Sequence, residues 1–304
     1  MKFLILGGLG YLGRCLHKHL SKTDEVFIID GNIHNRYDQS ELDVFGDKLH
    51  ICNLASTELS KRDLNWCCDI DTVISCLPTP DLDFLTNHRY QSYHTKFFEN
   101  IKLLGSCLPN ATNFVQLVDT MLSDPTYVDY WHEMVIRIDI PADMYHLPSL
   151  YGMEESFDNS TFINNCVLSF NAEKMFFLEG DPYEMIQFTE VNQYCNRIAS
   201  ILNGTGHPAG DRLDMLPKIM LANIIQEIFG ASEHEMQIDI SAERNFSIES
   251  GICFTSEEPI KRFIKAVQVG FSQGKTQELY HSKYDSKKTY ELIKLAHQYK
   301  EFIV

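Results

Sequence analysis

The sequence predicts an α/β fold, in which a doubly wound parallel sheet is followed by a smaller C-terminal α/β lobe. Three observations predict it. Short apolar runs alternate with helical segments over the first half of the chain, and a cluster of glycines directly follows the first run. The regular alternation ends after Gly152. Parallel strands joined by crossover helices produce such alternation, and 304 residues are enough for two lobes.

Strands are expected at the apolar runs, which are rich in β-branched residues and are bounded by Gly, Pro or Asp. They fall within residues 2–6, 25–30, 48–54, 71–77, 114–119 and 143–152. Short apolar runs also occur in buried helices, but these boundaries favour strands. Leu12, Leu16 and Leu20 are four residues apart and predict the apolar face of a helix, and residues 90–108 predict another helix.

The charge and composition of the chain exclude several classes of partner. A formal net charge of −16 disfavours nucleic acid and anionic membranes, and no apolar stretch approaches the length of a membrane span. Nine cysteines, an odd number, suit a reducing compartment, so a cytoplasmic protein is expected. The adjacent Cys67 and Cys68 lack the spacing of metal ligands, and no metal is expected.

The glycine cluster is the most specific motif in the sequence. Gly7, Gly10 and Gly13 form G-x-x-G-x-x-G between an expected strand and an expected helix. The first glycine permits a tight turn, the second lets backbone N–H groups approach a pyrophosphate, and the third lets the helix pack against the strand. Asp30 closes the next strand, 17 residues after Gly13. Together these features predict a Rossmann-type dinucleotide site.

The acid indicates which dinucleotide binds. A carboxylate at Asp30 accepts hydrogen bonds from the adenosine ribose and repels a 2′-phosphate, which favours NAD over NADP. Asn32 follows closely and is included among the expected cofactor contacts. Two alternatives stay open. One is that Asp30 caps or turns the chain before Gly31 and binds no ribose. The other is that Arg36 binds a 2′-phosphate, which would favour NADP.

These residues resemble the extended short-chain dehydrogenase/reductase family, which contains NAD-dependent nucleotide-sugar epimerases, dehydratases and dTDP-4-dehydrorhamnose reductases. The glycine spacing with Tyr11 and Leu12 is that family's form of the turn. The segment with Asn53 and Leu54 is similar to the family's segment beside the adenine, where an Asp is usual in place of Asn53. The resemblance therefore adds these four residues to the expected NAD site.

The resemblance also implies a division into domains. The dinucleotide-binding domain is expected over residues 1–152, with a returning segment at about 187–203. The substrate lobe is expected over 153–186 and 204–304. An amphipathic helix is expected within residues 286–303, near the end of this lobe.

The chain departs from the family at the catalytic residues. The resemblance places Thr120 at the catalytic Ser/Thr, but the family's Tyr-x-x-x-Lys pair is missing because residues 120–150 contain no lysine. Tyr127 and Tyr130 are the candidate phenols. A phenol has a pKa of about 10, and lowering it by about three units without a lysine would take about 4 kcal/mol from other groups. Ile186 stands near the position of an arginine that many relatives use on the nucleotide diphosphate.

The first functional hypothesis is an NAD-dependent oxidoreductase or epimerase/dehydratase-like enzyme that acts on a sugar or sugar nucleotide. The alternative is a catalytically silent NAD-binding protein that serves as a regulator, scaffold or partner subunit. A third possibility is that His132, His146 or Glu133 transfers the proton. Relatives of this fold often dimerise through the helices that flank the catalytic pair, so a homodimer is a candidate assembly.

Overall fold

The chain divides into two compact units, Met1–Leu147 and Pro148–Val304. The computed structural model describes residues 1–31, 39–78, 85–119, 125–152, 176–178, 185–206, 214–220, 224 and 236–238. The functional division expected at residue 152, with a segment returning at about 187–203, stays a prediction. The amphipathic helix expected within residues 286–303 lies outside the described residues.

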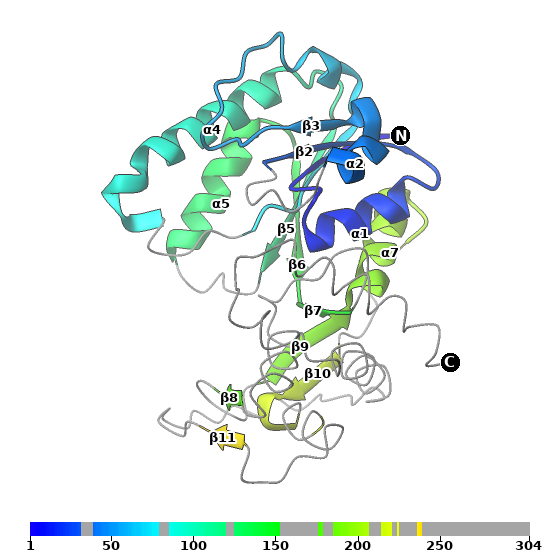
Figure 1. The fold of residues 1–304 in the computed structure, drawn as a ribbon, viewed down its shortest axis with the longest axis vertical. Helices are drawn as coiled ribbons and strands as arrows, with labels where there is room; N and C mark the ends of the chain where they lie inside the picture. Colours follow the sequence, from blue (N-terminus) through cyan, green and yellow to red (C-terminus); the bar gives the residue numbers. More distant parts are fainter. Residues whose placement is uncertain are drawn as a thin grey trace. The chain divides into compact units, whose positions relative to one another are not determined.

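A six-stranded parallel sheet organises the first unit (Figure 1). Its strands are β1 (Lys2–Leu6), β2 (Glu25–Asp30), β3 (Leu49–Ile51), β4 (Thr72–Ser75), β5 (Asn113–Asp119) and β6 (Ala142–Leu147). The strand order is β3-β2-β1-β4-β5-β6, and every neighbouring pair is parallel. This order confirms the predicted doubly wound sheet and is that of a Rossmann-type fold, in which the order reverses between β1 and β4.

Helices cover both faces of this sheet. Helix α1 (Tyr11–Leu20) lies on one side, and α4 (Gln91–Ser106) and α5 (Pro125–Ile138) lie side by side on the other (Figure 1). Leu12, Leu16 and Leu20 are all buried, which confirms the predicted apolar face of α1. The connections carry the short helices α2 (Gln39–Leu42), η1 (Asp43–Lys48), η2 (Asn65–Asp69) and η3 (His88–Tyr90).

The main core of the first unit packs α4 and α5 against one face of the sheet. Side chains at alternate strand positions supply the sheet's part of this core, because successive residues of a strand point to opposite faces. The core includes Leu4, Leu6, Val73, Phe114 and Val118 from the sheet, Phe97, Ile101 and Leu104 from α4, and Trp131, Met134 and Ile138 from α5.

The described part of the second unit contains two smaller sheets. Its elements are β7 (Ser149–Tyr151), β8 (Phe176–Leu178), β9 (Met185–Glu190), α7 (Val191–Leu202), β10 (Asp214–Pro217) and β11 (Met236–Ile238). Strand β9 pairs in parallel with β7 and antiparallel with β10, and β8 pairs in parallel with β11. In α7, Val191, Tyr194, Cys195 and Ile198 form the buried stripe.

One expected strand is two strands in the structure. The run 143–152 is divided at Pro148 into β6 of the six-stranded sheet and β7 of the three-stranded sheet. Proline has no backbone N–H to continue the hydrogen-bond ladder, which explains the break.

Two further features of the described residues bear on function. No helix among them combines the length and apolar character needed to cross a membrane. Within the same residues, no group of three or more His, Cys, Asp and Glu side chains could hold a metal ion.

Candidate functional site

The carboxyl ends of β1, β2 and β4 meet at one edge of the sheet. The Gly7 N–H, which follows β1, donates to the Ile29 carbonyl at 2.8 Å, and the Cys76 N–H, which follows β4, donates to the Leu6 carbonyl at 2.9 Å. Gly7, Asp30 and Cys76 therefore lie where the strand order reverses. Ligands of doubly wound sheets bind at this position.

The glycine turn connects β1 directly to α1. Gly7 has a φ of +78°, a conformation that side chains disfavour, and its carbonyl accepts from the Gly10 N–H at 3.2 Å. A Cβ on Gly13 would collide with the Gly7 carbonyl oxygen and would lie 2.6 Å from Gly8 Cα, so α1 packs on the turn itself. Among the described residues, a Cβ on Gly10 would meet the Gly7 carbonyl oxygen alone, at 3.4 Å. Within this part of the chain, Gly10 thus leaves room for a ligand to approach the turn.

The first turn of α1 has the electrostatic character of an anion site. Gly10 is the N-cap and provides no capping side chain, and the first turn contains no acidic residue. Backbone N–H groups at a helix N-terminus and the helix dipole both favour a bound phosphate. The residues present therefore fit the pyrophosphate of a dinucleotide.

Asp30 is tied to the glycine turn. Its Oδ2 accepts a hydrogen bond from the Leu9 N–H at 2.9 Å, and the bond is partly buried. Sequence reasoning considered a ribose contact or a cap before Gly31, but it missed this bond because Leu9 and Asp30 are 21 residues apart. Asn32, the next expected cofactor residue, lies outside the described residues.

Cys76 faces the same edge at the end of β4. Burial and the nearby Asp30 carboxylate both raise the pKa of the Cys76 thiol, so this side chain stays protonated at neutral pH. The resemblance of the fourth-strand segment indicated this region, but the sequence alone did not single out the cysteine.

Asn53 and Leu54 form a turn after β3. Asn53 Oδ1 accepts from the Ala55 N–H at 3.0 Å, and the Asn53 carbonyl accepts from the Thr57 N–H at 2.8 Å. The Leu54 side chain is buried in the main core, so a cofactor contact from this residue would involve its backbone. Asparagine side chains commonly stabilise such turns by bonding the backbone two residues on.

Asn100 holds this turn in place, and sequence reasoning did not identify it. Its Nδ2 donates to the Leu54 carbonyl and to the Thr57 carbonyl, both at 2.8 Å, from a buried position on α4. A polar residue on the buried face of a helix was the available sequence signal.

The two candidate phenols lie in the N-terminal half of α5. Thr120 lies outside the described residues. Tyr127 is half-buried in the first turn of α5, and Tyr130 follows one turn later. The structure thus brings the two tyrosines to one end of one helix.

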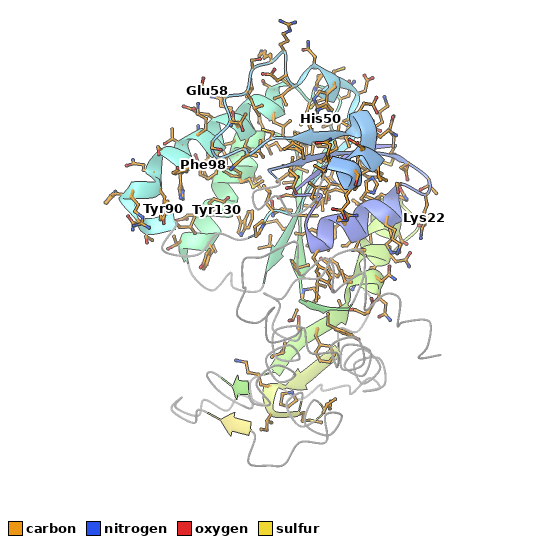
Figure 2. The ribbon with its side chains drawn as sticks, viewed as in Figure 1. Lys22, His50, Glu58, Tyr90, Phe98 and Tyr130 are labelled. Atoms are coloured by element: carbon orange, nitrogen blue, oxygen red, sulfur yellow. The ribbon has the colours of Figure 1, made fainter. Side chains whose placement is uncertain are left out.

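Tyr130 lies in an aromatic cluster between α4 and α5 (Figure 2). Its ring centroid is 6.0 Å from that of Phe97, 5.6 Å from that of Phe98 and 4.9 Å from that of Trp131. Burial raises the pKa of the Tyr130 phenol. A phenol that exchanges protons near neutral pH needs a lowered pKa, so this environment opposes such a role.

The other candidate proton carriers on α5 face outward. His132 is exposed, and Glu133 pairs with Arg137 at 2.6 Å. His146 lies on β6, but its side chain is outside the described part of the structure. Neither His132 nor Glu133 is buried.

Solved structures with this fold match nearly the whole chain. The dTDP-glucose 4,6-dehydratase from Streptomyces venezuelae, solved with NAD bound, is 14% identical, with a TM-score of 0.60 and 100% of each chain covered. The UDP-glucuronic acid 4-epimerase from Bacillus cereus, solved with UDP-glucuronic acid and NAD, is 15% identical, with a TM-score of 0.58 and coverage of 95% of this chain and 99% of the epimerase.

A third match is the UDP-N-acetylglucosamine 4-epimerase from Bacillus cereus, at 12% identity and a TM-score of 0.55, over 90% of this chain and 97% of the epimerase. No protein-family model matches the sequence, and no curated protein matches it either. The TM-scores of 0.55–0.60 establish a shared fold at these low identities. The chain therefore has the Rossmann-type fold of these sugar-nucleotide enzymes.

Proposed function

We propose that the chain is an atypical member of the extended short-chain dehydrogenase/reductase family that binds NAD and acts on a sugar or sugar nucleotide. The observation that carries the proposal is the glycine turn, closed by the bond from Leu9 to Asp30 at the reversal of strand order. The fold shared with sugar-nucleotide epimerases and dehydratases supports the substrate class.

The cofactor would lie across the carboxyl ends of the strands. The first turn of α1 would hold the pyrophosphate, and Asp30 would accept hydrogen bonds from the ribose hydroxyls. The Asp30 carboxylate would repel a 2′-phosphate, which supports NAD over NADP. The nicotinamide supplies a hydride acceptor for oxidation of a sugar carbon.

Proton transfer is the step for which the chain lacks the family's usual Tyr-x-x-x-Lys pair. Between the two candidate phenols, the environments favour Tyr127, because Tyr130 is packed in the aromatic cluster of α4 and α5. Thr120 would bond the substrate hydroxyl, as the family resemblance implies. A general acid or base of this kind contributes about 10²- to 10⁴-fold to the rate.

A catalytically silent NAD-binding protein is the second candidate. The sequence contains no lysine between residues 120 and 150, and the pKa of Tyr130 is raised by burial. Such a protein would keep the cofactor turn and the fold while serving as a regulator, scaffold or partner subunit.

Two measurements separate the candidates. In the first, NAD and NADP are titrated into the full chain by calorimetry. In the second, UDP- and dTDP-sugars are incubated with the chain and NAD. Chromatography then follows the sugar products, and absorbance follows the reduced nicotinamide. Product that disappears in Tyr127→Phe supports the enzyme. NAD binding without product across the panel supports the silent protein.

A homodimer through α4 and α5 is the assembly that we infer. Val128, His132 and Ile136 are spaced by four residues along α5, and all three are exposed. Tyr93 on α4 is exposed as well. The exposed apolar side chains of Val128, Ile136 and Tyr93 favour a helix-to-helix interface. Light scattering of wild type and of Ile136→Lys tests it, with a dimer expected only for the wild type.

A further inference from the structure

Three polar side-chain atoms in the main core have no hydrogen-bond partner among the described residues: Ser75 Oγ, Gln116 Oε1 and Trp131 Nε1. Ser75 and Gln116 have no exposed surface, and Trp131 is 1% exposed. Buried polar atoms are nearly always hydrogen-bonded to protein or to ordered water, because an unmet bond costs folding free energy. Each of these three atoms therefore calls for a partner.

Ser75 and Gln116 are direct neighbours in the sheet. They pair across β4 and β5, which brings their side chains together on one face. The face is the one covered by α4 and α5, since Val73 and Phe114, two positions earlier on the same strands, belong to the core that contains Trp131. Ser75 and Gln116, from β4 and β5, thus lie on the face of the sheet that borders the core containing Trp131.

The hydrogen-bonding capacities of the three atoms complement one another. Gln116 Nε2 donates to the Leu117 carbonyl at 3.0 Å, which fixes the amide so that Oε1 is left as an acceptor. Trp131 Nε1 is a donor only, and the Ser75 hydroxyl is both donor and acceptor. A water molecule accepts from an indole and donates to an amide oxygen and a hydroxyl, and buried waters typically make about three such bonds.

We propose that Ser75, Gln116 and Trp131 bind an ordered internal water between β4, β5 and α5. The water joins α5 to the two central strands of the sheet by hydrogen bonds. It is a structural site separate from the glycine turn, so it stands whether or not the chain binds NAD.

A high-resolution crystal structure of the full chain tests the site directly. The expected result is density for one water within hydrogen-bond distance of Ser75 Oγ and Gln116 Oε1, with Trp131 Nε1 as its third contact. A direct Ser75–Gln116 hydrogen bond with no water, or a dry core, would overturn the proposal.

Ser75→Ala provides a second test that needs no crystal. It removes the hydroxyl, which makes no other hydrogen bond among the described residues, and urea unfolding measures the result. If the water is bound, the variant removes one of its partners and lowers the folding equilibrium constant by about tenfold. If Oγ is simply unpaired, its removal leaves that constant unchanged or raises it, and the proposal fails.

Leu117→Met is the matched control. Leu117 is buried on the opposite face of β5 from Gln116, so the control makes a volume-conserving change away from the three polar atoms. The loss expected for Ser75→Ala should exceed that for Leu117→Met, and an equal loss in both variants would count against the water site.

Discussion

The Leu9 N–H donates a 2.9 Å hydrogen bond to Asp30 Oδ2, and this bond joins the glycine turn to the end of β2. The acid expected to recognise the ribose therefore also holds the loop that would bind the pyrophosphate. Two substitutions separate these roles, because asparagine keeps an oxygen acceptor for Leu9 and alanine does not.

Asp30→Ala should weaken NAD binding at least tenfold and lower the free energy of unfolding by about 1 kcal/mol, the usual contribution of one hydrogen bond. Asp30→Asn should keep more of that stability and lose much of the preference for NAD over NADP, because the repulsion of a 2′-phosphate is gone. Calorimetric titration and urea unfolding measure both effects. Unchanged NAD affinity in Asp30→Ala would show that the ribose acid is misassigned.

Gly10→Ala and Gly13→Ala should fail in different ways. In the part of the chain that the structure describes, the added Cβ on Gly10 meets the Gly7 carbonyl oxygen alone, at 3.4 Å, so folding should persist while the methyl group obstructs the pyrophosphate and NAD affinity falls. The added Cβ on Gly13 collides with the turn and should cost about 1–3 kcal/mol of stability, as overpacking does. Thermal unfolding with and without NAD distinguishes them. Normal NAD binding by Gly10→Ala would argue against a pyrophosphate at α1.

Tyr127→Phe should lower kcat by about 100-fold or more if the chain is an enzyme, because it removes the proposed general acid. Tyr130→Phe should leave kcat within about twofold, since its ring packs between α4 and α5 and burial raises its pKa. Turnover of the active sugar nucleotide is the measurement. The reverse order of effects would transfer the role to Tyr130.

His50 should make the protein less stable as the pH falls. Its ring stacks on that of Trp66 with the ring centroids 3.7 Å apart. Burial lowers the pKa of His50 below its usual value of about 6.5, although Asp47 acts in the opposite direction. Below the unfolded-state pKa, the unfolded chain binds the proton more readily, so stability is lost from about pH 6.5 downward until the folded-state pKa is passed. Urea unfolding across this range should show a shallower dependence in His50→Phe. An unchanged slope in that variant would exclude His50 as the cause.

Much of the fold could be predicted because local patterns determine it. The spacing of Leu12, Leu16 and Leu20 places one face of α1 in the core, and β-branched runs between turn residues mark the parallel strands. The break at Pro148 was missed because an apolar run continues on both sides of it. A missing N–H ends a ladder without interrupting the hydrophobic pattern.

The candidate site was harder to predict because its contacts are distant in sequence. The bond from Leu9 to Asp30 spans 21 residues, and Asn100 holds a turn more than 40 residues before it. The sequence leaves Tyr127 and Tyr130 as alternatives, and the packing of Phe97 and Phe98 against Tyr130 distinguishes the two environments. Such differences depend on which helices meet, which a single sequence does not specify.

The central claim, that the glycine turn and Asp30 form an NAD site, is tested most directly by calorimetric titration of the full-length chain with NAD and with NADP. The account predicts saturable binding of NAD at one site per chain, tighter than that of NADP, and loss of that binding in Gly10→Ala while the variant stays folded. The absence of NAD binding by the folded wild-type chain would contradict it.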